Sequence, residues 1–316
     1  MLISNCTKLF STQTASKMNP SNDPYAYLGF TKNADASITR IPGHIPTTAA
    51  SIDPANPVLT KDLPINPQTN TWARLYYPSA ATKLPVIVYY HGGGFVLCSA
   101  ASSMFHNFLS GITLSIPALV VSVDYRLAPE HRLPAAYNDC AEALRWVNAS
   151  EDEWLTGRAD MYIMGTSAGG NIAYHVGLKE AARMKIRGLI LHHPFFGGVE
   201  RSASEMRLVD DAVLPASVAD LMWSLALPIG CDRDHEFCNP VEVEIVEKVK
   251  VLVTGCGGDP LIDRQKEVAR MLAENGVDVI QEFSEGGCRG IELFDESKAL
   301  VFYELLKNFL STCIID

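Results

Sequence analysis

Five residues near the middle of the chain, Gly165-Thr166-Ser167-Ala168-Gly169, limit most strongly what it can fold into. They follow a short apolar run, residues 161–164, and precede a stretch with helical spacing, residues 170–183. Small residues two places before and after Ser167 allow the backbone to turn sharply. The pattern predicts a strand, a tight turn and a helix, with the Ser167 hydroxyl projecting at the end of the strand. The same five letters also occur in ordinary glycine-rich loops, so the neighbouring segments decide between the two interpretations.

The rest of the chain alternates short apolar runs with stretches of helical spacing. The runs are rich in β-branched side chains, which is typical of strands buried on both faces. We expect strands at residues 72–77, 84–90, 118–123, 161–164, 189–191, 249–254 and 277–283. We expect helices at residues 104–114, 134–148, 170–183, 260–275 and 297–310. This alternation predicts an α/β fold with a mostly parallel sheet that helices cover on both faces.

Two segments interrupt this alternation. Residues 18–70 are rich in Pro, Asn, Asp, Ser and Thr without a sustained period, and they predict an irregular arm. Residues 199–245 are helical around 215–227 and otherwise resemble loops. We therefore expect a single domain over residues 18–316, in which the two segments form a cap over the strand ends. Residues 1–17 are rich in Ser and Thr and lack acidic residues, which predicts either an extension or a weak targeting segment.

Charge and cysteine content narrow the possible partners. The 316 residues include 26 Lys and Arg against 36 Asp and Glu, a formal net charge of −10. Because there is no Lys/Arg-rich tract, we expect neither nucleic acid nor an anionic membrane surface as a partner. No apolar run approaches the roughly 20 residues of a membrane-spanning helix. The eight cysteines form no CxxC pair and no cluster with zinc spacing, so we expect no metal and a reducing, cytoplasmic location.

A second glycine-rich motif, His91-Gly92-Gly93-Gly94, directly follows the apolar run at residues 84–90. Glycines at this place allow several backbone N–H groups to turn towards one point. With the N–H of Ala168, the residue after the serine, the three glycines predict an oxyanion hole. A merely flexible loop is the alternative.

Between these motifs lies a cluster of charged residues and prolines. Residues 124–131 read Asp-Tyr-Arg-Leu-Ala-Pro-Glu-His, and they are followed by Leu-Pro-Ala-Ala at 133–136 and by Asp139. The cluster begins as a buried strand ends, and its prolines fix the direction of the chain. We interpret it as a structural brace with internal ion pairs, without a catalytic role.

The order of these motifs resembles the hormone-sensitive-lipase-like group of α/β hydrolases. It is most similar to the plant carboxylesterases that also include the gibberellin receptor. Residues 232–236 with 238–240, and residues 258–264, match the same group, so that the resemblance covers residues 18–316. It implies an α/β-hydrolase fold and a carboxylesterase for esters of small, fairly apolar acids or alcohols. It also implies an acyl-enzyme mechanism that needs no metal or organic cofactor.

The resemblance further implies a catalytic triad with Ser, Asp and His in chain order. The nucleophile maps to Ser167 and the acid to Asp259. Asp259 also follows the strand expected at residues 249–254. The carboxyl end of such a parallel strand lies at the edge where Ser167 emerges. An Asp-Pro pair is also a common start of a turn, which is the structural alternative for Asp259.

The third triad position is not occupied by histidine. The family places its histidine after the next strand, in a Gly-Gly-x-His segment, and here residues 285–293 have Arg289 in that place. Arginine stays protonated and offers no acceptor atom, so it cannot replace the base. We expect Arg289 to pair with Asp259 or to bind an anionic group. Loss of a triad member costs on the order of 10⁶ in turnover and leaves roughly 10³ to 10⁴ over water.

Two adjacent histidines lie close to the predicted site in the sequence order of the strands. His192-His193-Pro194 follows a strand on the same edge; we expect one histidine to pack and the other to bond locally, with replacement of the base as the alternative. Three functions are compatible with these motifs: an impaired ester hydrolase, a binding protein, and a non-hydrolytic cyclase or lyase. The gibberellin receptor lacks the catalytic histidine and holds a small acid under its cap, and an arginine in the site suits such a carboxylate.

Overall fold

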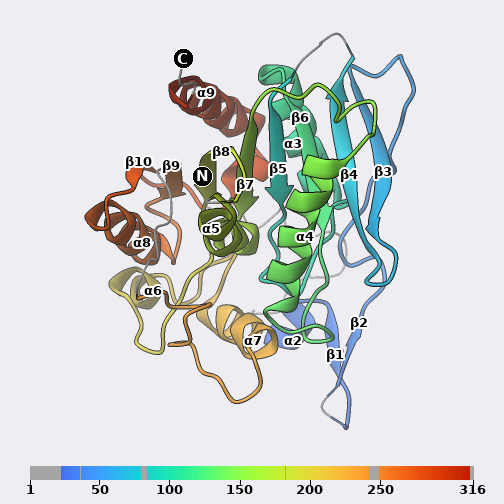
Figure 1. Ribbon diagram of the computed structural model, residues 1–316. Helices are drawn as coiled ribbons and strands as arrows, with labels where there is room; N and C mark the ends of the chain where they lie inside the picture. Colours follow the sequence, from blue (N-terminus) through green and yellow to red (C-terminus); the bar gives the residue numbers. More distant parts are fainter. Residues whose placement is uncertain (1–22, 36, 80–83, 182, 242–248, 314–316) are drawn as a thin grey trace.

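One central sheet lies at the core of the protein (Figure 1). The computed structural model describes residues 23–35, 37–79, 84–181, 183–241 and 249–313. Within these ranges the sheet has eight strands: β3 (Val58–Asn66), β4 (Thr71–Pro78), β5 (Val86–Tyr90), β6 (Leu119–Asp124), β7 (Met161–Thr166), β8 (Ile186–His192), β9 (Lys250–Cys256) and β10 (Asp278–Ser284). Their order is β10-β9-β8-β7-β5-β6-β4-β3. β4 is antiparallel to β3 and β6, and the remaining neighbours are parallel.

Helices cover both faces of this sheet. One face carries α4 (Ala135–Ala149), α5 (Ala168–Ala181) and α8 (Ile262–Glu274), whose apolar side chains belong to one buried cluster. The other carries α3 (Ser103–Ser115) and α9 (Glu296–Thr312), which bury a second cluster. Every residue of β5 and β7 is buried, as expected for strands covered on both sides. The predicted α/β architecture is therefore confirmed.

Each strand and helix expected from the sequence is present, with ends displaced by a few residues. The expected strand at residues 189–191 begins earlier, at Ile186. The expected helix at residues 170–183 begins at Ala168, directly after the serine of the sharp turn. The apolar patterns therefore located the elements well, while the ends depended on local turn geometry.

The prediction of an irregular arm over residues 18–70 is wrong for residues 58–66. They form β3, an edge strand that pairs with β4. Pro64 and the charged side chains remove the usual strand signal from this segment of the sequence. An edge strand nevertheless tolerates proline, because one row of its N–H groups has no partner strand. Asp62 of β3 also accepts a hydrogen bond from the buried Arg74 of β4 over 2.7 Å. This pairing between strands gives the segment a stability that local propensity does not indicate.

The register of the parallel strands aligns their carboxyl ends. Tyr90 at the end of β5 pairs with Gly165 of β7, and Thr166 of β7 pairs with His192 of β8. His192 in turn pairs with Thr254 of β9. The loops after these four strands therefore leave the sheet side by side at one edge, as ligand-binding loops of α/β sheets do.

Five short elements lie beyond that edge: α2 (Pro24–Tyr27), β1 (Phe30–Lys32), β2 (Ile38–Arg40), α6 (Ala203–Arg207) and α7 (Ala216–Ala226). Figure 1 shows α2, β1, β2 and α7 together at the lower end of the molecule. The Tyr27 hydroxyl donates hydrogen bonds to the carbonyl oxygens of Ala212 (2.9 Å) and Val213 (3.2 Å). The two segments predicted to form a cap are therefore joined to each other. The predicted extension at residues 1–17 lies outside the described residues.

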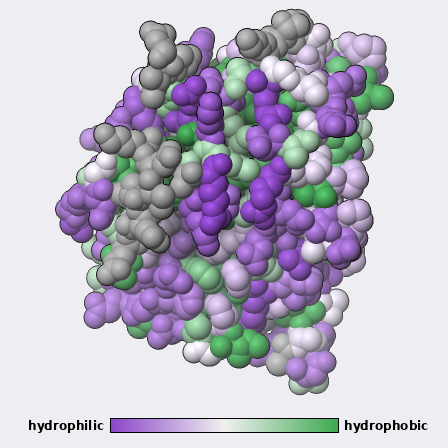
Figure 2. Space-filling model, in the orientation of Figure 1, coloured by the Kyte–Doolittle hydropathy of each residue, from purple (hydrophilic) through white to green (hydrophobic). Residues whose placement is uncertain are grey.

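The surface seen in Figure 2 is largely hydrophilic over the face that carries α4 and α5. A groove of about 730 Å³ on this face is lined by residues of both helices, among them Glu142, Lys179 and Glu180. It contains none of the residues that the sequence predicts for the site. Among the described helices, none is both long and apolar enough to cross a membrane.

Candidate active site

Ser167 stands at the sharp turn between β7 and α5. Its φ of 58° lies in the left-handed region, which costs a non-glycine residue about 1 to 2 kcal/mol. The turn is held by a hydrogen bond from the Ser167 N–H to the carbonyl of His192 over 2.9 Å. A Cβ on Gly165 would collide with the carbonyl of Gly169, and one on Gly169 would collide with the carbonyl of Tyr90. Both glycines are therefore required by close backbone contact, and Ser167 is left half-buried at the strand end.

The glycine loop after β5 lies directly against this serine. A Cβ on Gly92 would be 3.2 Å from Ser167 Cβ. Gly93 and Gly94 have φ values of 115° and 60°, which side-chain-bearing residues rarely adopt. Within the described chain, the N–H groups of Gly93, Gly94 and Ala168 donate no hydrogen bond to another group. Three backbone donors near Ser167 thus remain available to an anionic oxygen.

The charged cluster after β6 supports this loop, as predicted for a structural brace. The Tyr125 hydroxyl donates to the carbonyl of His91 over 2.7 Å, and the two rings stack with centroids 4.3 Å apart. Arg126 forms an ion pair with the buried Asp139 of α4 over 2.7 Å. Burial lowers the pKa of His91 to about 4, so this ring packs in its neutral form.

Asp259 lies in the loop between β9 and α8 and is fully buried. Its Oδ1 accepts a hydrogen bond from the N–H of Leu261 over 2.9 Å. Its Oδ2 accepts from the Gln265 amide over 2.8 Å and contacts His193 Nδ1 at 2.9 Å. Burial would raise the pKa of Asp259, but the charge of Arg289 and the bond to His193 outweigh it and lower the pKa to about 2. The carboxylate is therefore ionised and held in a single orientation.

Arg289 fills the space between Asp259 and Ser167. It lies in the loop after β10 and is only 5% exposed. Its Nη1 donates to Asp259 Oδ2 over 2.6 Å, and its Nη2 donates to Ser167 Oγ over 2.9 Å and to the carbonyl of His193 over 2.7 Å. The expected pairing of Arg289 with Asp259 is confirmed. The guanidinium thus links the acid to the serine hydroxyl, which is the position between acid and nucleophile that a triad base needs.

The two histidines at the end of β8 behave differently. His192 is buried against Phe302, with ring centroids 4.2 Å apart, and its Nδ1 lies 2.7 Å from Thr254 Oγ1. His193 contacts Asp259 through Nδ1, while its Nε2 lies 3.4 Å from Glu292 Oε2. Burial alone would lower the pKa of His193, but Glu292 and Asp259 outweigh this effect and raise the pKa to about 9. Its ring makes no hydrogen bond to Ser167, so the geometry does not support the alternative in which His193 replaces the base.

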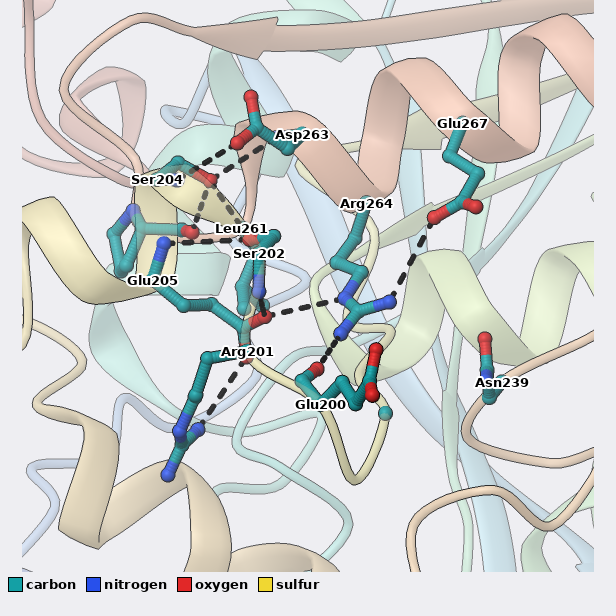
Figure 3. Close-up of polar contacts among 12 residues, drawn as sticks. Glu200, Arg201, Ser202, Ser204, Glu205, Asn239, Leu261, Asp263, Arg264 and Glu267 are labelled. Atoms are coloured by element: carbon teal, nitrogen blue, oxygen red, sulfur yellow. Dashed lines mark hydrogen bonds and ion pairs between the residues drawn. The ribbon is translucent and has the colours of Figure 1, made fainter.

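A polar network fixes the loop that carries Asp259 (Figure 3). The N–H of Ser204 donates to Asp263 Oδ2 over 2.7 Å, and its hydroxyl donates to the carbonyl of Pro260 over 2.7 Å. Arg264 of α8 pairs with the buried Glu205 over 3.2 Å. Residues of α6 therefore hold the first turn of α8, and the position of Asp259 depends on the segment before α7.

The structure brings together Ser167, Asp259, Arg289, Ala168 and the loop at Gly92–Gly94. The sequence did not indicate the roles of Gln265 and Glu292. Gln265 lies six residues after Asp259, where the first turns of α8 bring its amide back to the carboxylate. Glu292 is on a short 3₁₀ helix, η1 (Ile291–Leu293), for which the sequence has no periodic signal. The chemical roles of all these residues stay predictions.

Comparison with known proteins gives the class of this fold and site. The profile of a family described as having the α/β-hydrolase fold matches residues 87–291. The chain therefore belongs to the α/β hydrolases, and within them to the group of plant carboxylesterases. Carboxylesterase 20 of Arabidopsis thaliana is 49% identical over 322 residues, covering 93% of this chain and 98% of that protein.

Two further proteins show how far the similarity extends. A 3-O-acetylpapaveroxine carboxylesterase of Papaver somniferum, CXE1, is 42% identical and covers 91% of this chain and 97% of its own length. The solved structure of an esterase of Pyrobaculum calidifontis is 25% identical, with a TM-score of 0.71 over 85% of this chain and 87% of that one. The predicted family and fold are thus confirmed.

Proposed function

We propose that this protein is a carboxylic-ester hydrolase with Ser167 as nucleophile, slowed because Arg289 occupies the place of the triad base. The observation that carries the proposal is the hydrogen bond from Arg289 Nη2 to Ser167 Oγ. The contacts of Arg289 retain the geometry of a triad, from Asp259 through the linking residue to the serine. The linking residue, however, can only donate protons.

The proposed reaction follows the acyl-enzyme route. Ser167 Oγ attacks the carbonyl carbon of the ester, and the oxyanion that forms accepts hydrogen bonds from the N–H groups of Gly93, Gly94 and Ala168. Collapse of this intermediate breaks the bond to the alcohol, and water then hydrolyses the acyl-enzyme. In each step the attacking oxygen loses its proton to solvent and the leaving oxygen takes a proton from solvent, because Arg289 cannot accept a proton and pass it on.

The missing base sets the size of the expected defect. Loss of a triad member costs on the order of 10⁶ in turnover, which is roughly 8 kcal/mol of transition-state stabilisation. The oxyanion donors and substrate binding still supply about 10³ to 10⁴ over the reaction in water. Slow, serine-dependent hydrolysis is therefore the expected behaviour.

We further propose that the described residues among 23–57 and 199–241 form the cap over the site, whereas β3 belongs to the sheet. A Cβ on Gly94 would collide with the side chain of Met222 of α7, so α7 lies against the oxyanion loop. Trp223 of the same helix stacks on Phe195, with ring centroids 4.6 Å apart. This apolar cover favours esters of small, fairly apolar acids, and the acetyl ester in the name of the Papaver relative agrees with that class.

Hydrolysis of p-nitrophenyl acetate and butyrate tests the proposal. We compare the unaltered protein with Ser167→Ala and Arg289→His. The control is Arg270→Lys, because the Arg270 side chain is exposed and pairs with Glu274 away from the serine. We expect slow hydrolysis that Ser167→Ala abolishes and that Arg289→His raises by at least about tenfold. Fast, Ser167-dependent hydrolysis by the unaltered protein would reveal another base. Rates equal to the blank for both the unaltered protein and Arg289→His would exclude a hydrolase.

A specific observation favours a second function, the binding of a small carboxylate without turnover. The guanidinium of Arg289 and the N–H groups of Gly93, Gly94 and Ala168 lie near one half-buried hydroxyl, and each of these groups is able to donate a hydrogen bond to a ligand. Such a set suits a carboxylate, as the family's resemblance to the gibberellin receptor also suggests.

Calorimetry with butyrate as the probe tests this second function. We expect Arg289→Gln to weaken butyrate binding at least tenfold if the guanidinium holds the carboxylate, while butyramide binds to neither form. Equal binding of butyrate and butyramide would exclude the function. A non-hydrolytic cyclase or lyase has no observation in its favour among the described residues.

A further inference from the structure

Three side-chain atoms behind the acid converge on one point without a hydrogen-bond partner. They are Nε2 of His192, Nε2 of His193 and Oε2 of Glu292, and all three are buried. Glu292 Oε2 lies 3.6 Å from His192 Nε2 and 3.4 Å from His193 Nε2, and the three atoms lie within 4.8 Å of one another. Buried polar atoms without partners are rare because they lose their bonds to water. A shared ligand would satisfy all three.

The backbone brings the two imidazoles to the same side. Consecutive residues of a strand point their side chains to opposite faces. His193, however, follows the last residue of β8 and has a φ of 47°, in the left-handed region that is unfavourable for a histidine. The two ring centroids are therefore only 4.7 Å apart, and the rings meet edge to face. This conformation turns adjacent histidines into a pair that can bind one ion.

The other nitrogen of each imidazole already has a partner. His192 Nδ1 lies 2.7 Å from Thr254 Oγ1, and His193 Nδ1 lies 2.9 Å from Asp259 Oδ2. In metal sites, a ligating histidine typically donates its second N–H to a carboxylate or another oxygen, which orients the ring and leaves one lone pair for the metal. Both histidines have this arrangement, with Nε2 directed at Glu292.

We propose that His192, His193 and Glu292 bind one Zn²⁺ ion. Two imidazole nitrogens and one carboxylate oxygen form a ligand set that suits zinc, whereas Mg²⁺ and Ca²⁺ prefer oxygen ligands throughout. With metal–ligand bonds of about 2.0 to 2.1 Å, tetrahedral ligand atoms are roughly 3.3 Å apart. The measured 3.4 and 3.6 Å are close to that separation. A water molecule would complete the tetrahedral coordination.

Charge and access also favour a cation here. Zinc displaces the proton of His193, because an imidazole binds a metal in its neutral form. The two negative charges of Asp259 and Glu292 and the positive charge of Arg289 then leave one net negative charge around the imidazoles. The Glu292 side chain is 15% exposed, whereas both histidines are 1% exposed. An ion can therefore enter from the Glu292 side. The sequence predicts no metal because its Cys and His residues form no cluster with zinc spacing. That criterion does not detect two adjacent histidines that meet a glutamate about 100 residues later in the chain.

Zinc titration of the full chain, after removal of metals with EDTA, tests the proposal. We expect one Zn²⁺ per chain by calorimetry and by elemental analysis after desalting. Glu292→Gln, which keeps the shape of the side chain, should lose this ion. Thr254→Val, which removes only the oxygen that contacts His192 Nδ1, should weaken the affinity for zinc about 10- to 100-fold. The control is His175→Gln, because His175 also has a buried, unpartnered Nε2 but packs against Tyr137, outside the site.

Co²⁺ as a replacement ion separates this site from thiol sites. The described chain has free cysteines, including the exposed Cys231, and thiolates give Co²⁺ strong near-ultraviolet bands. We expect visible tetrahedral bands without the thiolate bands. Thiolate bands, or equal zinc content in the unaltered protein and Glu292→Gln, would overturn the proposal and leave a charged His193–Glu292 pair. If Glu292→Gln does not fold, equal affinity in Thr254→Val and His175→Gln would overturn it as well.

Discussion

The guanidinium of Arg289 donates a hydrogen bond to the hydroxyl oxygen of Ser167 over 2.9 Å. In a serine hydrolase this oxygen donates its proton to a neutral imidazole, so the direction of the bond is reversed here. The same guanidinium is anchored to the buried Asp259 over 2.6 Å. The carboxylate therefore orients a cation beside Ser167, and in the proposed mechanism this cation occupies the place of the base.

The pH dependence of hydrolysis should differ between the unaltered protein and Arg289→His. Without a base, attack by Ser167 needs hydroxide from solvent, and we expect kcat/KM to rise about tenfold per pH unit from pH 6 to 9. In Arg289→His the rise should level off above the pKa of an ordinary histidine, about 6.5. Initial rates with p-nitrophenyl acetate, corrected for the blank at each pH, measure both profiles. A plateau in the unaltered protein would mean that another group accepts the proton.

Free imidazole should restore activity to Arg289→Gly. The truncation leaves a space beside the carboxylate of Asp259, the carbonyl of His193 and the hydroxyl of Ser167. Imidazole in that space can donate to Asp259 and accept the serine proton, as the triad base does. We expect rates that rise and saturate with imidazole concentration, at least about tenfold above those without it. Arg270→Gly, which removes an exposed guanidinium paired with Glu274, should show no such response. Absence of the response in Arg289→Gly would argue against a base at this position.

Removal of the charge of Asp259 should destabilise the fold. Asp259→Asn leaves the buried Arg289 without its counter-charge and replaces an oxygen that accepts three bonds. Breaking a buried pair in this way costs about 3 to 5 kcal/mol in the free energy of unfolding. Glu274→Gln, which breaks an exposed pair with Arg270, should cost less than about 1 kcal/mol. Urea unfolding measures both, and equal effects would show that burial of the pair does not matter.

The cost of Asp259→Asn should also depend on pH. The pKa of Asp259 is lowered to about 2 in the folded protein, against about 3.9 for an unfolded aspartate. Its ionisation therefore contributes stability that is fully present above the unfolded value and is lost as pH falls through the folded value. We expect the difference between the unaltered protein and Asp259→Asn to be constant from pH 5 to 7 and to shrink towards pH 2. A constant difference down to pH 2 would contradict the lowered pKa.

Loss of the hydroxyl of Tyr27 should affect the proposed cap. Tyr27→Phe removes the hydrogen bonds to the carbonyls of Ala212 and Val213, worth about 1 kcal/mol. In the Arg289→His background we expect KM for p-nitrophenyl butyrate to rise several-fold while kcat changes little. Tyr303→Phe is the matched control, because the Tyr303 hydroxyl of α9 donates to the carbonyl of Phe108 in α3, away from the proposed cap. Equal changes of KM in both variants would argue against a cap that depends on Tyr27.

The sequence predicted the sheet and its helices because their signals are local. Near-continuous apolar runs such as residues 84–90 indicate buried strands, and Gly165 and Gly169 indicate a turn that only glycine permits. The sequence did not predict β3, because the stability of this strand depends on its pairing with β4. An isolated segment with Pro64 and two adjacent charged residues has no strand signal of its own.

The candidate site also combines features that the sequence predicts with features that it cannot predict. Ser167, Asp259 and the glycine loop follow strands, and the carboxyl ends of parallel strands meet at one edge, so their proximity could be inferred from chain order. The sequence also showed that Arg289 stands where histidine was expected. It could not show that this guanidinium donates to Ser167, since that contact joins residues 122 positions apart.

The sequence by itself determined the family, the alternation of strands and helices along the chain, and an arginine at the position where the family resemblance implies histidine, because motifs and periodicity are properties of neighbouring residues. Only the tertiary structure decided that Arg289 also donates to Ser167 and that Glu292 lies beside His193. Adjacent histidines normally point apart, yet a left-handed backbone at His193 turns both towards Glu292. Hydrogen bonds and burial across distant segments fix such directions, and no local pattern records them.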